Sequence, residues 1–363
     1  MVTKKGNRWV MRGSIRLLDG TLKNYNKIIK DESVKRKEQA KLYELNFRNT
    51  YNHNYEEAQN AFITLGEFIE VYKKDKEYET KESTKRSFNN NIKHLKPLYN
   101  YKINLITAND IKKVTDNHYK THNVATTNLL IKTIKKIMNY AEKKGVIVSS
   151  PASKIDFYKD INEIKKEVDY YTPQEWQILE PHLKDTGIIF YTFFELLYYT
   201  GMRKSEARAL TFEDIDMIKR TIRINKTVTD ISTNKQKWLV TSPKTTNSNR
   251  TILIPQKLFE ILTKYLEKFN DDDKKAFLFG IDRPLSPTTI RVNFITATTN
   301  AGLRHIRIHD LRHSHASMLI NNGALDKAVA DRLGNTVDMV RSTYSHLFLD
   351  TEKELINIID NIK

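Results

Sequence analysis

Four short segments in the second half of the chain combine residue types that suit chemistry on a phosphodiester. They are Thr-Gly-Met-Arg-Lys-Ser-Glu at 200–206, Ser-Pro-Lys-Thr-Thr at 242–246, His-Asp-Leu-Arg-His at 309–313, and Leu-Gly-Asn followed by Thr-Tyr-Ser-His within 333–346. Attack on a phosphodiester places additional negative charge on the phosphoryl oxygens, so a catalyst needs fixed cations there. Arginine is suited to this because its permanently charged planar fork can bind two oxygens. Arg203 and Arg312 are therefore the candidate phosphate-binding pair.

A lysine in the second segment is a candidate proton donor. Lys244 lies in a turn between two expected strands, Trp238–Thr241 and Arg250–Ile254. A lysine on a flexible hairpin can reach into a DNA groove and protonate a departing oxygen as general acid. Lys235 and Lys237 compete for this role, and an ordinary turn lysine is the alternative interpretation.

Tyr344 is the candidate nucleophile. The chain holds 18 tyrosines, so a single tyrosine carries little information. The segment Thr-Tyr-Ser-His around Tyr344 is more specific, because it begins shortly after Leu333-Gly334 and its tyrosine lies 32 residues beyond Arg312. A phenol with an ordinary pKa of about 10 is a weak nucleophile at neutral pH, so it needs basic and cationic neighbours.

The histidines around Arg312 admit a second interpretation. His309 and His313 are spaced i, i+4 with Asp310 beside the first, which faintly resembles a zinc-protease helix. That motif requires Glu and a third ligand, and Arg312 inside it would repel a metal. The sequence also has no Walker-type glycine-rich loop and no obvious carboxylate cluster for two metals. We therefore expect neither a metal nor an organic cofactor.

Taken in this order and spacing, the four segments resemble the tyrosine recombinase family, in particular lambda-integrase-like integrases of phages and integrative elements. The resemblance is close over roughly the last 190 residues, from about Tyr170, and looser before that. It implies that DNA strands are broken one at a time through a 3′-phosphotyrosine at Tyr344, and that the free 5′ hydroxyl attacks a partner strand. It further implies the roles of the remaining residues. Arg203 and Arg312 would clamp the phosphate, and His309 would hydrogen bond the phosphate and help to accept the tyrosine proton. Lys244 would protonate the leaving group, and Glu206 would orient the site.

One position departs from the family pattern. After Leu333-Gly334 the family usually has His and sometimes Trp, whereas this chain has Asn335. An amide can donate a hydrogen bond to a phosphoryl oxygen, but it cannot shuttle a proton. The sequence does not distinguish natural variation, an engineered change or reduced activity.

The resemblance also implies partners, and two rival functions stay open. The family acts as a homo-tetramer on two double-stranded DNA sites, and an accessory DNA-bending or excision factor is plausible. A type IB topoisomerase would share the tyrosine chemistry without strand exchange. A catalytically impaired DNA-binding architectural protein is the other rival, and Asn335 is its only support.

The elements that must position these residues predict a mainly α fold with small β-sheets. We expect an arm-type DNA-binding domain of three strands plus a helix at 1–55, a helical core-binding domain at 60–160 and a mixed, mainly helical catalytic domain at 168–363. The helical and catalytic domains are expected to form a C-shaped clamp on DNA. In the catalytic domain, periodicity and caps predict helices at 173–184, 187–200, 204–210, 256–269, 287–301, 309–322, 325–333 and 336–343. An amphipathic tail helix is expected within 352–362.

The first domain is predicted from a hairpin and a capped helix. Strands at 8–17 and 21–29 flank the turn signal Asp19-Gly20, and Ser33 is a candidate N-cap for a helix reaching Phe47, with a linker from Asn49. Trp9 and Tyr25 either face DNA or pack on that helix. The candidate DNA contacts, on this sheet and on a later helix, are Arg12, Arg16, Lys23, Lys132, Lys135 and Lys136.

Bulk composition supports a nucleic-acid partner. The formal net charge is +17 with a pI near 9.5, and residues 1–165 carry 14 of the 17 excess positive charges. Such an excess predicts a polyanionic partner. The chain has no cysteine, which excludes disulfides and thiol chemistry and suits a reducing compartment. It has no signal-like or membrane-length apolar run, so we expect a cytoplasmic protein without membrane contact.

Overall fold

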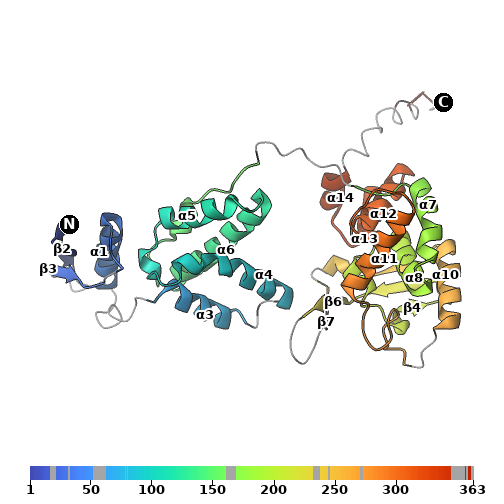
Figure 1. Ribbon diagram of the computed structural model, residues 1–363, viewed down its shortest axis with the longest axis horizontal. Helices are drawn as coiled ribbons and strands as arrows, with labels where there is room; N and C mark the ends of the chain where they lie inside the picture. Colours follow the sequence, from blue (N-terminus) through green and yellow to red (C-terminus); the bar gives the residue numbers. More distant parts are fainter. Residues whose placement is uncertain are drawn as a thin grey trace. The chain divides into compact units, whose positions relative to one another are not determined.

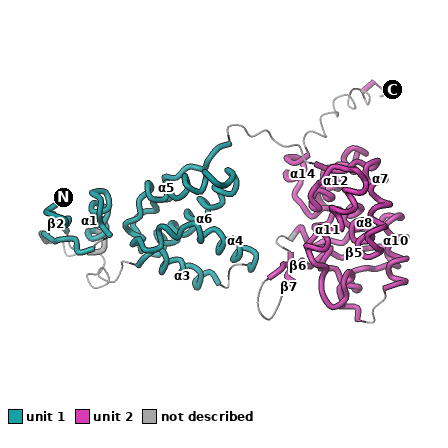
Figure 2. The backbone as a smooth tube through the Cα atoms, viewed as in Figure 1, with its two compact units in different colours: residues 1–164 teal, residues 165–363 magenta. Residues whose placement is uncertain are grey.

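The computed structural model describes residues 1–16, 22–31, 33–51, 63–77, 79, 81–160, 169–231, 238–243, 246–269, 273–344, 356 and 359–360. The chain divides into two compact units, residues 1–164 and 165–363 (Figures 1 and 2). Helices dominate both units and the strands form small antiparallel sheets, so the predicted mainly α fold is confirmed. None of the described helices combines the length and apolar character needed to cross a membrane.

The first unit begins with a three-stranded antiparallel sheet covered by one helix. The sheet has the order β1 (Val2–Lys5), β2 (Arg8–Arg16), β3 (Leu22–Ile29), and α1 (Lys37–Tyr51) packs against it. Trp9 and Tyr25 are buried in the core between sheet and helix, and the Tyr25 ring centroid lies 5.3 Å from that of Phe47. These two aromatic residues therefore pack on the helix and do not form a face for DNA.

Two predicted boundaries in this region were wrong. The helix begins at Lys37 and not directly after Ser33, because the Ser33 hydroxyl donates to Asp31 Oδ1 at 2.5 Å and caps no helix. The backbone N–H groups of residues 35 and 36 donate instead to the side chain of Gln39. The helix also continues through Tyr51, into the segment predicted as a linker. The predicted Asp19-Gly20 turn lies outside the described residues.

The rest of the first unit is a helical bundle. Its elements are α3 (Leu65–Asp75), α4 (Glu82–Ile92), η1 (Lys93–Leu98), η2 (Ile103–Leu105), α5 (Ala108–Tyr119), α6 (Val124–Lys143) and η3 (Pro151–Lys154). Thr64 and Thr107 begin α3 and α5 with capping boxes that satisfy the first N–H groups of each helix. The apolar stripe of α6, which includes Ile134 and Ile137, is buried in the centre of the bundle. Sheet and bundle are joined into one unit by contacts such as the hydrogen bond from Asn46 Nδ2 of α1 to the carbonyl oxygen of Asn104 at 3.0 Å and the ion pair between Arg36, directly before α1, and Asp110.

The second unit surrounds a large apolar core with helices and two small sheets. The helices are α7 (Pro173–Lys184), α8 (Ile188–Thr200), α9 (Lys204–Ala207), η4 (Phe212–Asp214), η5 (Thr246–Ser248), α10 (Gln256–Lys268), α11 (Pro287–Asn300), α12 (Asp310–Asn321), α13 (Asp326–Leu333) and α14 (Val337–Tyr344). The strands are β4 (Ile215–Asp216), β5 (Thr221–Ile224) and β8 (Arg250–Leu253) in one sheet, and β6 (Thr227–Asp230) with β7 (Trp238–Thr241) in the other. Helix α8 lies at the centre of this core and contacts α7, α10 and α12.

Most of the predicted catalytic-domain helices match these elements within one or two residues. The helix predicted at 204–210 is the exception, because α9 ends at Ala207 after a single turn. The predicted tail helix within 352–362 lies almost entirely outside the described residues.

Candidate active site

Two helices of the second unit end at a glycine that lies one or two residues before a candidate site residue. Gly201 ends α8 with φ 63° and Gly334 ends α13 with φ 69°, both in the left-handed region that favours glycine. A Cβ on Gly201 would lie 2.6 Å from side-chain atoms of His315 and Leu333, so the site leaves no room for another residue. These two turns direct the chain so that Arg203 and Asn335 meet.

Asn335 bridges the two candidate phosphate-binding arginines. Its Oδ1 accepts a hydrogen bond from Arg203 Nη2 at 3.0 Å and another from Arg312 Nη2 at 2.8 Å. Arg312 Nη1 donates to the carbonyl oxygen of Gly201 at 2.8 Å, which fixes the second guanidinium against the end of α8. The two cations predicted to bind one phosphate therefore converge on a single neutral acceptor.

The electrostatics of this pair favour an anion. Arg312 is buried and only 4% exposed, while Arg203 is half-buried. Burial and then the nearby charge of Arg203 lower the pKa of Arg312, which means that its charged form is destabilised in this structure. A phosphate bound between the two guanidinium groups would offset that cost, because it supplies negative charge at the point where they converge.

Glu206 orients Arg203 and Arg250 by accepting hydrogen bonds from both. The buried carboxylate accepts from the backbone N–H of Arg203 at 2.9 Å and from Arg203 Nη1 at 2.8 Å. It also accepts from Arg250 Nη2 at 3.0 Å. Burial alone would raise the pKa of Glu206, but the charge and hydrogen bond of Arg250 outweigh it and the pKa is lowered overall. Glu206 is thus a positioning residue held as a carboxylate.

Tyr344 and His313 form a hydrogen-bonded pair. Tyr344 is the last residue of α14, is 2% exposed, and its hydroxyl lies 2.7 Å from Nδ1 of His313 on α12. Burial raises the pKa of Tyr344, with the Arg312 charge acting in the opposite direction. Burial and the neighbouring His309 lower the pKa of His313 to about 4, so its imidazole is neutral at pH 7. A neutral imidazole can accept a proton from the phenol.

Of the remaining predicted catalytic residues, His309 is among the described residues and Lys244 is not. His309 is exposed directly before α12, with its ring centroid 5.5 Å from that of His313. Lys244 lies outside the described residues, as do its competitors Lys235 and Lys237.

Sequence reasoning missed a set of residues that position the site. Arg250 contacts Glu206, as described above, and its Nε donates to the carbonyl oxygen of Arg332 at 2.7 Å. Arg332 in turn donates from Nε to His315 Nε2 at 3.0 Å. His313 belongs to the His-Asp-Leu-Arg-His segment at 309–313, but the sequence interpretation treated it only as a candidate metal ligand. No signal in one sequence marks Arg250 or Arg332, because their roles depend on contacts between distant segments.

The predicted DNA-binding residues of the first unit fall into two groups. Arg12 is exposed on β2 and donates to Asn26 Oδ1 at 3.0 Å, whereas the side chains of Arg16 and Lys23 are outside the described part of the structure. On α6, Lys132 and Lys136 are exposed and Lys135 is half-buried. These three belong to a groove of about 900 Å³ between α3, α4 and α6, here called the lysine groove, whose basic lining residues are Lys73, Lys74, Lys76, Lys85, Lys132, Lys135, Lys136 and Lys143.

Comparison with known families gives two matches. The model described as the phage integrase family matches residues 171–350, and the model described as the phage integrase N-terminal SAM-like domain matches residues 64–117. Among curated proteins, the chain is 26% identical over 272 residues to the ICEBs1 integrase of Bacillus subtilis (strain 168), covering 70% of this chain and 72% of that one. It is 24% identical over 367 residues to a XerC-like tyrosine recombinase of Caldanaerobacter subterraneus subsp. tengcongensis, covering 93% and 91%.

Solved structures share the fold. The integrase of the Tn1549 transposon in complex with a circular intermediate DNA superposes with a TM-score of 0.68 at 18% identity, covering 82% of this chain and 99% of that chain. A lambda integrase tetramer bound to a Holliday junction gives a TM-score of 0.58 at 16% identity, covering 92% and 95%.

Proposed function

This chain belongs to the phage integrase family of tyrosine recombinases, and on that premise we propose that it integrates and excises a mobile element with Tyr344 as the nucleophile. The observation that carries the proposal is the convergence of Arg203 and Arg312 on one point, in the same unit as a buried tyrosine paired with a neutral histidine. Family membership makes the chain a site-specific DNA recombinase, and the assignment of roles to residues is our proposal.

In the proposed cleavage step, Arg203 and Arg312 bind the non-bridging oxygens of the scissile phosphate in place of Asn335 Oδ1. Tyr344 Oη attacks phosphorus, the new tyrosine–phosphorus bond forms, and the bond to the 5′ oxygen breaks. The phenol proton passes to His313, with His309 hydrogen bonding the phosphate, and Lys244 protonates the departing 5′ oxygen. The phosphodiester energy is kept in the phosphotyrosine, so the strand can be rejoined without a nucleotide cofactor.

Asn335 has a defined part in this scheme. Its Oδ1 aligns the two guanidinium groups before DNA arrives, and its amide nitrogen can then donate to a phosphoryl oxygen. It carries no charge and moves no proton. We therefore propose an active enzyme in which His313 and Lys244 carry the proton transfers and His309 hydrogen bonds the phosphate.

The first unit supplies sequence-independent grip on DNA in this proposal. The lysine groove gathers eight lysines on one surface of the bundle, a footprint suited to phosphates. Strand exchange requires four active sites on two DNA sites, so we propose a homo-tetramer on DNA, assisted by a DNA-bending or excision factor. The DNA substrate and the absence of cysteine fit action in the bacterial cytoplasm.

The proposal is tested with a nicked suicide DNA that carries the element's end sequence. Wild-type protein should form a denaturation-resistant protein–DNA adduct, and Tyr344→Phe should bind the same DNA without forming one. Tyr265→Phe is the matched control, because Tyr265 is also a buried tyrosine of the second unit whose hydroxyl is hydrogen-bonded, to the carbonyl oxygen of Leu278 at 2.7 Å. An adduct with Tyr344→Phe, or none with wild type on DNA that it binds, would overturn the assignment. Relaxation of a plasmid that lacks the site would point to a topoisomerase.

A further inference from the structure

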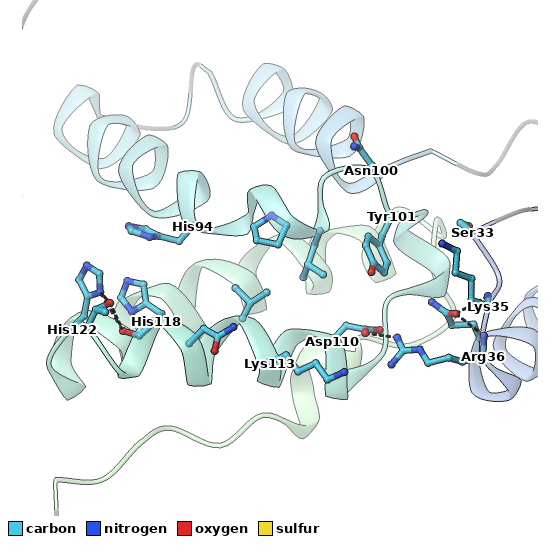
Figure 3. Close-up of a pocket in the computed structure, with 16 residues that line it drawn as sticks. Ser33, Lys35, Arg36, His94, Asn100, Tyr101, Asp110, Lys113, His118 and His122 are labelled. Carbon is cyan, nitrogen blue, oxygen red and sulfur yellow. Dashed lines mark hydrogen bonds and ion pairs between the residues drawn. The ribbon is translucent and has the colours of Figure 1, made fainter.

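Three histidines gather at one end of a groove in the first unit, whereas every residue assigned a role in DNA cleavage belongs to the second unit. His94 comes from η1, His118 from the last turn of α5, and His122 from the turn that follows α5. One ring nitrogen from each can be chosen so that all three lie within 4.8 Å of one another. Figure 3 shows the three imidazoles at the same end of the groove, which has a volume of about 720 Å³.

The hydrogen bonds of two of these rings leave one nitrogen of each available. His118 Nδ1 lies 3.0 Å from Thr127 Oγ1, so the Nε2 atom is its remaining ligand atom. His122 Nδ1 lies 2.8 Å from Thr121 Oγ1 and 3.2 Å from the carbonyl oxygen of His118. The tautomer with its proton on Nδ1 satisfies that carbonyl, which can only accept, and leaves the lone pair of Nε2 for a metal. Metal-binding histidines typically have this arrangement, in which the outer nitrogen donates to a protein oxygen.

The rings must rotate before they can share one metal ion, because the stacked His118 and His122 rings do not direct their in-plane lone pairs at a common point. The His94 ring lies edge-on to His118 and His122, with centroids 4.6 and 5.4 Å away, while the His118 and His122 rings are stacked at 3.9 Å. A tetrahedral zinc site, with nitrogens about 2.0–2.1 Å from the metal, brings its ligand nitrogens to about 3.4 Å from one another. His94 and His122 are exposed and only His118 is buried, so small rotations of the two outer side chains can close the difference.

We propose that His94, His118 and His122 form a binding site for a divalent transition-metal ion, Zn²⁺ foremost, that fastens η1 to the end of α5. Three imidazoles are a ligand set that Zn²⁺, Cu²⁺ and Ni²⁺ accept, with water in the fourth position. The ion would join two segments that already pack together in the bundle. It would stabilise the domain and takes no part in DNA cleavage, so the site stands independently of the proposed function.

The test uses the full chain without a polyhistidine tag. Zn²⁺ is titrated by calorimetry, and the bound metal is counted by elemental analysis after dialysis. The variant His94→Asn/His122→Asn removes the two exposed ligands and leaves buried His118 in place. His182→Asn is the matched control, because His182 is a half-buried histidine on α7 in the other unit.

We expect one Zn²⁺ per chain in wild type and in His182→Asn, and an affinity more than about 100-fold weaker in the double variant. Zn²⁺ should also slow hydrogen–deuterium exchange at residues 93–98 and 115–123 in wild type only. Equal Zn²⁺ binding by wild type and the double variant would place the metal elsewhere and overturn the proposal. The proposal would also be overturned if wild type bound no stoichiometric Zn²⁺, or if Zn²⁺ did not slow exchange at residues 93–98 and 115–123. If circular dichroism shows that the double variant is unfolded, the single variant His122→Asn is tested in its place, with the same measurements and the same criteria.

Discussion

The hydroxyl oxygen of Tyr344 lies 2.7 Å from Nδ1 of His313, a residue 31 positions earlier in the chain. Helices α12 and α14 thus hold the proposed nucleophile against a proton acceptor before any DNA is bound. Since burial raises the pKa of the phenol, ionisation in advance is disfavoured and the proton must leave during attack. His313 is neutral at pH 7 and in position to take it.

Replacing His313 by alanine should therefore slow adduct formation by on the order of 100-fold and leave DNA affinity unchanged, because the change removes the proton acceptor and no phosphate contact. Single-turnover cleavage of the suicide DNA measures the rate, and exogenous imidazole should restore part of it. His305→Ala is the control, since His305 is an exposed histidine of the same unit bonded to Thr298. Wild-type rates in His313→Ala would remove His313 from the proton path.

Asn335→Asp should separate the bridging role of the side chain from its charge. The aspartate has the same shape and can accept from Arg203 and Arg312, so the fold is kept. Its negative charge would occupy the place of the phosphate, and we expect a loss of at least about 100-fold in cleavage rate. Asn335→His supplies a residue that can move a proton and should cleave at least as fast as wild type. An Asn335→Asp protein with full activity would show that the bridge does not mark the phosphate position.

Much of this site could be predicted from the sequence because its residues lie in short, ordered motifs. Arg203 and Asn335 each follow a glycine that ends a helix, and such a glycine can be recognised from the sequence alone. Arg250 has no such signal, because it acts through Glu206, which lies 44 residues away. The helix start after Ser33 was wrong for a different reason: Asp31 accepts from the serine hydroxyl, and the Gln39 side chain accepts from the backbone N–H groups of residues 35 and 36 just before α1 begins at Lys37.

Glu206→Gln should destabilise the second unit and slow cleavage together. Arg250 is buried and would lose its carboxylate partner, and breaking a buried ion pair costs roughly 3–5 kcal/mol. Arg203 would also lose its anchor, so phosphate binding should weaken. Urea denaturation at pH 7.5, followed by the fluorescence of Trp176 in a Trp9→Phe/Trp238→Phe background, measures the first effect. An unchanged urea midpoint would mean that Arg250 is held by its backbone contacts alone.

The lysine groove should contribute sequence-independent affinity. Each phosphate contact adds about 0.9 to the slope of log affinity against log salt concentration. Lys132→Ala/Lys136→Ala should lower that slope by roughly 1–2 and weaken binding equally on specific and unrelated DNA. Lys120→Ala, an exposed lysine at the end of α5 outside the groove, is the control. A slope unchanged in the double variant would exclude this surface from the DNA interface.

Glu195 should make the second unit less stable as the pH rises. It lies on α8 with no solvent exposure, and among the described residues neither of its carboxylate oxygens has a hydrogen-bond partner of normal geometry. Burial and then the charge of Glu180 raise its pKa to about 7. In the unfolded chain the pKa of a glutamate is about 4.3. Between about pH 4.3 and 7 the folded state therefore binds more protons than the unfolded state, and the free energy of unfolding falls as the pH rises through this range.

Glu195→Gln keeps the shape of the side chain and cannot ionise, so it should raise the free energy of unfolding by on the order of 2–4 kcal/mol at pH 8 but only by about 1 kcal/mol at pH 5. Trp176 fluorescence during urea denaturation at the two pH values measures the difference, again with Trp9 and Trp238 replaced by phenylalanine. Glu267→Gln, which changes an exposed carboxylate on α10, is the control. If the gain in Glu195→Gln is the same at both pH values, the carboxylate does not titrate in this range and the prediction is wrong.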